Sequence, residues 1–120
     1  MFYESIAKVY DYIFPKNRKQ LEFIECIEKI KTKEKILDIG CATGNLTELL
    51  GERTENVIGI DLDRELIKEA KLKNPRLIFE NMNMLEIDKS FEENSFNRIV
   101  SFGNTLVHLD NIGEIKVFFE

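Results

Sequence analysis

Along most of this chain, the spacing of hydrophobic residues among polar ones predicts strands separated by helices. Helical spacing of apolar residues in 45–51 and 63–73 predicts two helices. Asp63 is expected to cap the second helix, and Asn74 followed by Pro75 is expected to end it. Short apolar runs before, between and after these helices predict buried strands at 35–39, 56–60, 76–80 and 96–102. This alternation favours a parallel sheet with crossover helices.

Helical patterns also flank the predicted sheet. Residues 3–13 and 17–31 carry apolar side chains at a spacing of three or four, which predicts two amphipathic N-terminal helices. The polar stretch 88–95 is expected to be a loop. A last helical pattern begins near Asp110 or Asn111, and its apolar face would consist of Ile112, Ile115, Phe118 and Phe119.

These elements divide the chain into two parts. Residues 1–34 would form a helical cap, and residues 35–120 would form a partial α/β domain with four strands. Because a doubly wound sheet usually has five or more strands and the last helix is unfinished at Glu120, we expect an N-terminal part of a longer protein. Strand 96–102 would then have an exposed edge, which favours self-association.

Composition narrows the class of protein. A chain of 120 residues that is 43% hydrophobic and 32% charged suits one globular domain. It lacks an apolar stretch of about 20 residues that could cross a membrane, and its N-terminus lacks the pattern of a signal peptide. Cys26 and Cys41 lie in different contexts, one in a helical pattern and one in a turn, which disfavours a disulfide. We therefore expect a cytoplasmic protein with no membrane partner.

The charge balance bears on partners. The formal net charge is −5, from 17 basic and 22 acidic residues. Because phosphate binding needs a concentrated basic face, this balance disfavours a nucleic acid partner. The cluster Lys31–Lys35 is interrupted by Thr and Glu and is interpreted as a solvated helix end. No metal site is expected.

The candidate chemistry begins where the first predicted strand ends. The apolar run 36–39 contains Asp38, and three small residues follow it at Gly40, Ala42 and Gly44. Such a turn from strand to helix lets a ligand approach the backbone closely. A dinucleotide fingerprint would need glycine where Asn45 stands, and a P-loop would need a lysine within 36–47. Both of these nucleotide motifs therefore fit poorly.

The form G-x-A-x-G preceded by Asp resembles motif I of the class I S-adenosylmethionine-dependent methyltransferases, and the resemblance covers about residues 35–110. It implies a Rossmann-like fold, of whose seven strands this chain would hold the N-terminal four. It also implies S-adenosyl-L-methionine as cofactor and S-adenosyl-L-homocysteine as product. In that family, the acidic residue that here is Asp38 anchors the loop and the methionine end of the cofactor. Ala42 replaces the middle glycine of the family and is small enough to keep the close approach.

The resemblance also implies roles for residues at the ends of the later strands. Asp61 would accept the ribose hydroxyls, by the logic of dinucleotide folds, and Leu62 would pack on the adenine. Asn83 would accept from the adenine amine while Met84 covers the ring. Cys41 is expected to line the pocket with its backbone rather than to perform thiol chemistry. The expected cofactor-binding residues are Asp38, Gly40, Cys41, Ala42, Gly44, Asn45, Asp61, Leu62, Asn83, Met84, Ser101, Phe102 and Gly103.

Residues 101–109 bear on the methyl acceptor. Their sequence, Ser-Phe-Gly-Asn-Thr-Leu-Val-His-Leu, resembles methyltransferases that act on small molecules, including glycine and sarcosine N-methyltransferase-like proteins. It does not match the Asn-Pro-Pro-Tyr of DNA-base and protein-glutamine methylases. Tyr12, Asn104 and His108 would then contact the substrate. His108 is the only histidine, so it could relay a proton near neutral pH, with a structural role as the alternative.

Methyl transfer from a sulfonium is an in-line displacement that depends on positioning and on the exclusion of water. It needs no nucleophilic residue of the enzyme, so the motifs identify the cofactor better than the acceptor. Three interpretations remain open from the sequence. The first is a small-molecule methyltransferase, the second a non-catalytic cofactor-binding or scaffold module, and the third an NAD-dependent oxidoreductase with a similar strand order.

Overall fold

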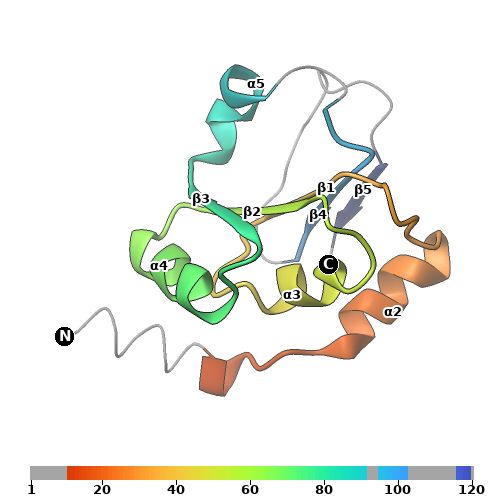
Figure 1. Cartoon of the computed structure of the whole chain (residues 1–120), viewed down its shortest axis with the longest axis horizontal. Helices are drawn as coiled ribbons and strands as arrows, with labels where there is room; N and C mark the ends of the chain where they lie inside the picture. Colours follow the sequence, from red (N-terminus) through yellow and green to blue (C-terminus); the bar gives the residue numbers. More distant parts are fainter. Residues whose placement is uncertain (1–10, 92–94, 103–115, 120) are drawn as a thin grey trace.

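A five-stranded parallel sheet forms the centre of the molecule, with strand order β3-β2-β1-β4-β5 (Figure 1). The computed structural model describes residues 11–91, 95–102 and 116–119. The chain starts the sheet in the middle, at β1, then adds β2 and β3 on one side and β4 and β5 on the other. The strands are β1 Ile36–Ile39, β2 Val57–Asp61, β3 Ile78–Asn81, β4 Arg98–Ser101 and β5 Lys116–Phe119.

The register brings the carboxyl ends of the strands to one edge of the sheet. Ile39, the last residue of β1, lies opposite Ile60 of β2 and Ser101 of β4. Asp61, the last residue of β2, lies opposite Asn81, the last residue of β3. The order of the strands reverses at β1, and in open α/β sheets ligands bind at the carboxyl ends of the strands beside such a point.

Helices cover both faces of the sheet. Figure 1 shows α2, α3 and α4 on one face, while α5 lies on the other after the short 3-10 turn η1. Leu21 and Ile24 of α2 share a core with Leu49 and Leu50 of α3. The predicted division of the chain at residue 34 stays a prediction. The helices are α2 Arg18–Ile27, α3 Asn45–Gly51, α4 Arg64–Lys73, η1 Met84–Glu86 and α5 Ile87–Ser90.

The ends of α4 follow the sequence signals. The Asp63 side chain accepts hydrogen bonds from the backbone N–H groups of Glu65 and Leu66, at 2.9 and 3.1 Å. Asp63 is therefore the helix cap that was predicted. The helix ends at Lys73, immediately before Asn74.

The predicted fold class, a Rossmann-like parallel sheet with flanking helices, is confirmed. The predictions of four strands and of a helix running to residue 120 are wrong, because 116–119 form β5, parallel to β4. The spacing of Phe118 and Phe119 fits a helix, but periodicity cannot separate helix from strand in so short an apolar run. The free edge of β4 decides the outcome, since its unpaired N–H and C=O groups accept another strand.

That strand also covers the edge of β4 that was expected to be exposed, so β5 and β3 form the two ends of the sheet in the described part of the chain. Self-association through a sheet edge stays a prediction. The predicted loop 88–95 begins inside α5, and the predicted helix 17–31 ends at Ile27. Of the predicted helix 3–13, only residues 11–13 are described, and they are helical. No helix within the described ranges is both long and apolar enough to cross a membrane.

Candidate functional site

The loop that joins β1 to α3 turns sharply through the left-handed region of backbone conformation. Gly40 has φ 73° and Gly44 has φ 86°, which favour glycine because a side chain there is strained. At Gly44 a Cβ atom would also lie 2.7 Å from Cζ of Phe79, so space as well as conformation requires glycine. Ala42 adopts φ 52° despite its side chain. The backbone N–H of Gly40 donates to the carbonyl of Ile60 at 2.9 Å, and this hydrogen bond joins the start of the loop to β2.

Asp61 joins the end of β2 to this loop. Its Oδ2 accepts a hydrogen bond from the backbone N–H of Ala42 at 2.8 Å, and its Oδ1 accepts one from the N–H of Asp63 at 2.8 Å. A carboxylate oxygen has capacity for more than one donor. The carboxylate of Asp61 is thus held in place by the backbone and can still accept from ligand hydroxyls.

Asn81, at the end of β3, fixes the turn that follows Asp61. Its Nδ2 atom donates to the carbonyls of Asp61 and Leu62, at 3.0 and 2.9 Å. The N–H of Met82 donates to the same carbonyl of Asp61 at 3.0 Å. Sequence reasoning missed Asn81, although an amide side chain at the end of a predicted strand next to Asp61 was a usable signal.

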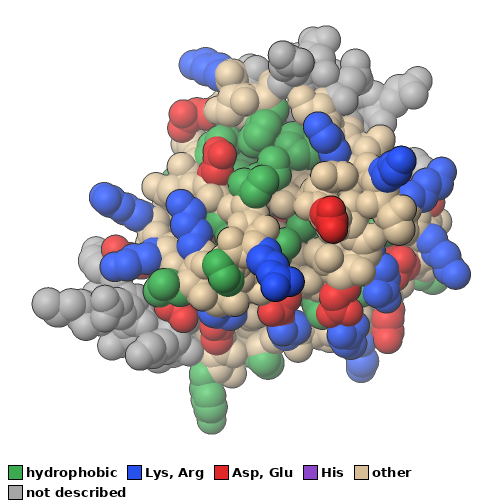
Figure 2. Space-filling view, viewed as in Figure 1, with side chains coloured by type: hydrophobic (Ala, Val, Ile, Leu, Met, Phe, Trp, Pro, Cys, Tyr) green, Lys and Arg blue, Asp and Glu red, His purple; other side chains and the backbone are tan. Residues whose placement is uncertain are grey.

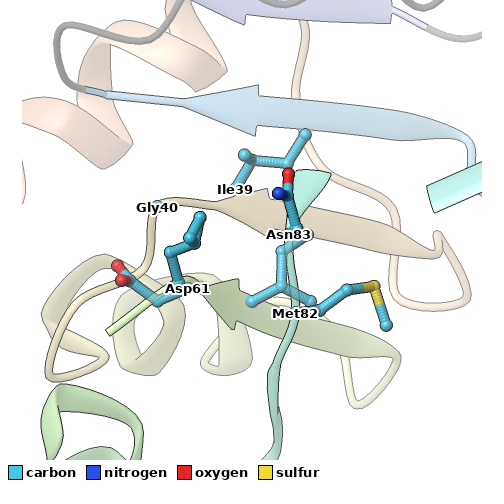
Figure 3. A pocket seen from close by; sticks show the side chains of 7 residues that line it. Ile39, Gly40, Asp61, Met82 and Asn83 are labelled. Atoms are coloured by element: carbon cyan, nitrogen blue, oxygen red, sulfur yellow. The ribbon is translucent and has the colours of Figure 1, made fainter. Parts of the chain in front are cut away.

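A pocket of about 200 Å³ opens at the carboxyl ends of β1 and β2. Figure 3 shows Ile39 and Gly40 on one strand end, Asp61 on the next, and Met82 and Asn83 on the segment after β3. Apolar walls and a few polar groups are typical of small-ligand sites. The lining residues are Ile39, Gly40, Ile60, Asp61, Leu62, Met82 and Asn83.

A second carboxyl group, that of Asp38, is buried in β1, with 2% of its surface exposed. Burial raises the pKa of Asp38 to about 7, and the negative charge of Asp61 adds to the shift. The Thr47 hydroxyl donates to Oδ2 of Asp38 at 2.7 Å and offsets part of the rise in pKa. Two carboxyl groups therefore lie close to the pocket and repel one another when both are ionised.

Burial also raises the pKa of the Cys41 thiol, and the charges of Asp38 and Asp61 raise it further. A thiol that stays protonated is a poor nucleophile. In the part of the chain that the structure describes, no group of His, Cys, Asp and Glu side chains is arranged to hold a metal ion.

Most of this chain is similar in sequence to known proteins. Residues 36–119 match the profile of a family described as methyltransferase domain. The chain belongs to this family. The methyltransferase domain is 41% identical over 80 residues to ribosomal RNA small subunit methyltransferase A of Mesomycoplasma hyopneumoniae. The aligned region covers 62% of this chain and 30% of that protein.

Other relatives carry different names. Over 56 residues the domain is 41% identical to the ubiquinone biosynthesis O-methyltransferase of Hydrogenovibrio crunogenus, covering 47% of this chain and 23% of that protein. Its fold resembles a phosphoethanolamine N-methyltransferase of Haemonchus contortus, with a TM-score of 0.70 and 24% identity over 84% of this chain and 26% of that one. That structure contains phosphomonomethylethanolamine and S-adenosylhomocysteine. The chain therefore spans less than a third of each of these three proteins.

The methyltransferase domain brings part of the expected cofactor site together. Four of the expected residues line the pocket directly, namely Gly40, Asp61, Leu62 and Asn83. Five others do not line the pocket but lie in β1, in the loop or at the start of α3, namely Asp38, Cys41, Ala42, Gly44 and Asn45. Met84 begins η1, directly after the pocket residue Asn83.

The remaining expected residues either do not line the pocket or lie beyond the described ranges. Ser101 is buried at the end of β4, beside Ile39. The ring of Phe102 packs edge to face on Phe23 of α2, with centroids 6.4 Å apart. Tyr12 is 88% exposed. Gly103, Asn104 and His108 lie outside the described residues.

Sequence reasoning also missed the apolar walls of the pocket. Ile39 and Ile60 end the buried part of their strands, and Met82 follows β3. The signal was present, because a residue that ends a parallel strand lies at the edge where ligands bind. Their apolar character alone does not distinguish them from the core.

Proposed function

We propose that this chain is the cofactor-binding part of an S-adenosylmethionine-dependent methyltransferase. One observation carries the proposal: the carboxylate of Asp61 is hydrogen-bonded to the left-handed loop at Ala42 and faces the same pocket as Gly40. A nucleoside ligand needs an acceptor for its ribose hydroxyls and a backbone that it can approach closely. Both are present within one pocket.

The pocket residues suggest how the cofactor would be held. Asp61 would accept from the ribose hydroxyls, and Leu62 and Met82 would cover the adenine, with Asn83 at its edge. The amino-acid end would lie over Gly40, where a Cβ would meet no atom within 4 Å. When bound, the cofactor supplies an electrophilic methyl group on a sulfonium. The carboxylate of Asp61 in the pocket wall favours a cationic ligand of this kind.

The acceptor that we propose is a small molecule. The net charge of −5 and the mixture of basic and acidic side chains on the face shown in Figure 2 do not favour a polyanion. The names of the ubiquinone biosynthesis O-methyltransferase and the phosphoethanolamine N-methyltransferase point to small acceptors for those relatives. Contacts of Tyr12, Asn104 and His108 with the acceptor, and proton relay by His108, stay predictions.

A ribosomal RNA acceptor is the second candidate. It is favoured by the 41% identity over 80 residues with a ribosomal RNA methyltransferase. The expectation that the protein has no nucleic acid partner therefore stays a prediction. Incubation of the full-length protein with methyl-labelled cofactor and either ribosomal RNA or a panel of amines, carboxylates and hydroxylated metabolites separates the two candidates. Label in the RNA fraction alone would overturn the small-molecule proposal.

The cofactor proposal is tested by calorimetric titration of the full-length protein with S-adenosylhomocysteine and with NAD. We expect binding of the first and none of the second. Asp61→Ala should weaken S-adenosylhomocysteine at least about tenfold, because a charged hydrogen-bond acceptor is lost. Asp63→Ala is the matched control, since it removes only a helix cap and should leave affinity unchanged. Equal affinity of Asp61→Ala and the unmodified protein would refute the assignment.

A further inference from the structure

A polar cluster lies outside the pocket residues, where the N-terminal segment meets the loop and the end of α4. Its members are Asp11, Thr43, Asn45 and Lys73, and we call it the loop latch. Oδ1 of Asp11 accepts hydrogen bonds from the Thr43 hydroxyl and from Nδ2 of Asn45, the latter at 3.1 Å. Oδ2 of Asp11 accepts one from Nζ of Lys73 at 2.9 Å. The carboxylate thus connects three separate parts of the chain.

The other members of the loop latch also contact one another. Nζ of Lys73 donates to Oδ1 of Asn45 at 2.9 Å, and Nδ2 of Asn45 donates to the carbonyl of Phe14 at 3.1 Å. Burial raises the pKa of Asp11, but hydrogen bonds from Thr43 and Lys73 and the charge of Lys73 outweigh it and lower the pKa. Asp11 is therefore ionised at neutral pH and paired with a cation.

The loop latch holds loop residues that do not line the pocket. Thr43 is fully buried and stands between Ala42 and Gly44, both in the left-handed region. On the pocket side, Ala42 donates to Asp61. Two carboxylates, one from residue 11 and one from residue 61, thus hold adjacent residues of the same short loop.

We propose that Asp11 is a positioning residue for the loop, so that docking of residues 11–14 and ligand binding in the pocket strengthen one another. This inference rests on the proposed function only for the identity of the ligand. The Asp11 contacts hold the loop in the conformation that closes the Ala42–Asp61 hydrogen bond. A ligand that binds this conformation must in turn stabilise the docked segment, because coupling between two sites is reciprocal.

The test uses the full-length protein with Asp11→Ala, Asp11→Asn and Lys73→Met. Hydrogen exchange of the amides of 41–46 is measured without ligand, and S-adenosylhomocysteine affinity is measured by calorimetry. In Asp11→Ala we expect faster loop exchange and affinity about five- to tenfold weaker. Asp11→Asn and Lys73→Met should give exchange rates and affinities between those of Asp11→Ala and the unmodified protein, since each keeps part of the hydrogen-bond network.

Arg18→Ala is the matched control. Arg18 pairs with Glu52, the residue that follows α3, at 2.8 Å, and this ion pair joins α2 to the end of α3 without contacting the loop. This variant should change neither loop exchange nor affinity. In the unmodified protein, saturating S-adenosylhomocysteine should slow exchange at 11–17.

Two results would count against the inference. Loop exchange in Asp11→Ala equal to that in Arg18→Ala would overturn the positioning role. If the unmodified protein binds no S-adenosylhomocysteine, the coupling to this ligand and the proposed function both fail. Loop exchange without ligand would still decide whether Asp11 positions the loop.

Discussion

The backbone N–H of Ala42 donates to Oδ2 of Asp61 across 2.8 Å, although Ala42 has a φ of 52° that favours glycine. The hydrogen bond holds a non-glycine residue in a strained conformation at the point where the loop meets the pocket. The loop is therefore shaped by a contact with the end of β2 as well as by its glycines.

Replacing Ala42 by glycine should stabilise the domain. A left-handed conformation costs an L-residue about 1 kcal/mol or more, and the greater chain entropy of unfolded glycine cancels part of this gain. We expect the free energy of unfolding to rise by about 0.5 to 1 kcal/mol in urea titration. A decrease would show that the methyl group contributes more than the strain costs.

The two loop glycines should differ in their tolerance of alanine. Gly40 and Gly44 share a left-handed φ, but a Cβ on Gly40 meets no atom within 4 Å, whereas one on Gly44 meets the ring of Phe79 at 2.7 Å. Gly40→Ala should lower the free energy of unfolding by about 1 kcal/mol through backbone strain alone. Gly44→Ala should lower the free energy of unfolding by about 1 to 3 kcal/mol more than this, because the added methyl group overpacks against the ring of Phe79.

A smaller side chain at position 79 separates the steric cost of Gly44→Ala from the cost of its backbone strain. In a Phe79→Leu background the added cost of Gly44→Ala should fall towards that of Gly40→Ala. The free energy of unfolding is measured by chemical denaturation for Gly40→Ala, Gly44→Ala, Phe79→Leu and the double variant Gly44→Ala/Phe79→Leu. Equal costs for Gly40→Ala and Gly44→Ala would contradict the close contact.

Asp38 should make stability fall as pH rises. Burial raises its pKa from 3.8 to about 7 in the folded protein. Between about pH 4 and pH 7 the folded protein keeps a proton that the unfolded chain has lost, so the free energy of unfolding decreases by up to about 1.4 kcal/mol per pH unit. Above pH 7 both forms are ionised and this contribution becomes constant.

Asp38→Asn should remove this dependence. The variant and the unmodified protein should be similarly stable near pH 4, and the variant more stable near pH 8. Thr47→Val is the companion variant, because loss of the Thr47 hydroxyl raises the pKa of Asp38 further and extends the decrease to higher pH. Parallel stability curves for Asp38→Asn and the unmodified protein would exclude the raised pKa.

Arg98 should be essential for stability. Its side chain is fully buried at the start of β4, where Nη2 pairs with Oε1 of Glu34 at 3.0 Å and Nη1 donates to the carbonyl of Glu28 at 2.9 Å. Arg98→Met leaves the Glu34 carboxylate without this partner and should cost about 3 to 5 kcal/mol. The double variant Arg98→Met/Glu34→Gln should lose less stability than the two single variants together, as measured by a double-mutant cycle in urea. Additive costs would show that the two residues are not coupled.

Local pattern was sufficient for the centre of this fold. The strand, turn and helix of 36–51 and the capped helix that ends before Asn74 could be read from the chain, because apolar periodicity, glycines and caps act over a few residues. Asp61 could be placed near the loop because the carboxyl ends of adjacent parallel strands meet at one edge of the sheet. The family match covers residues 36–119, which include this part of the chain.

Tertiary structure decided what depended on distant partners. Whether 116–119 formed a helix or a strand was settled by the free edge of β4, and the local sequence suits both. The hydrogen bonds of Asn81 to the Asp61 turn and of Asp11 to Lys73 join residues 20 and 62 positions apart. The amino-acid sequence by itself determined the strands and helices between residues 36 and 81 and which carboxylate ends β2. Only packing decided which side chains meet around the loop, because such contacts leave no periodic trace along the chain.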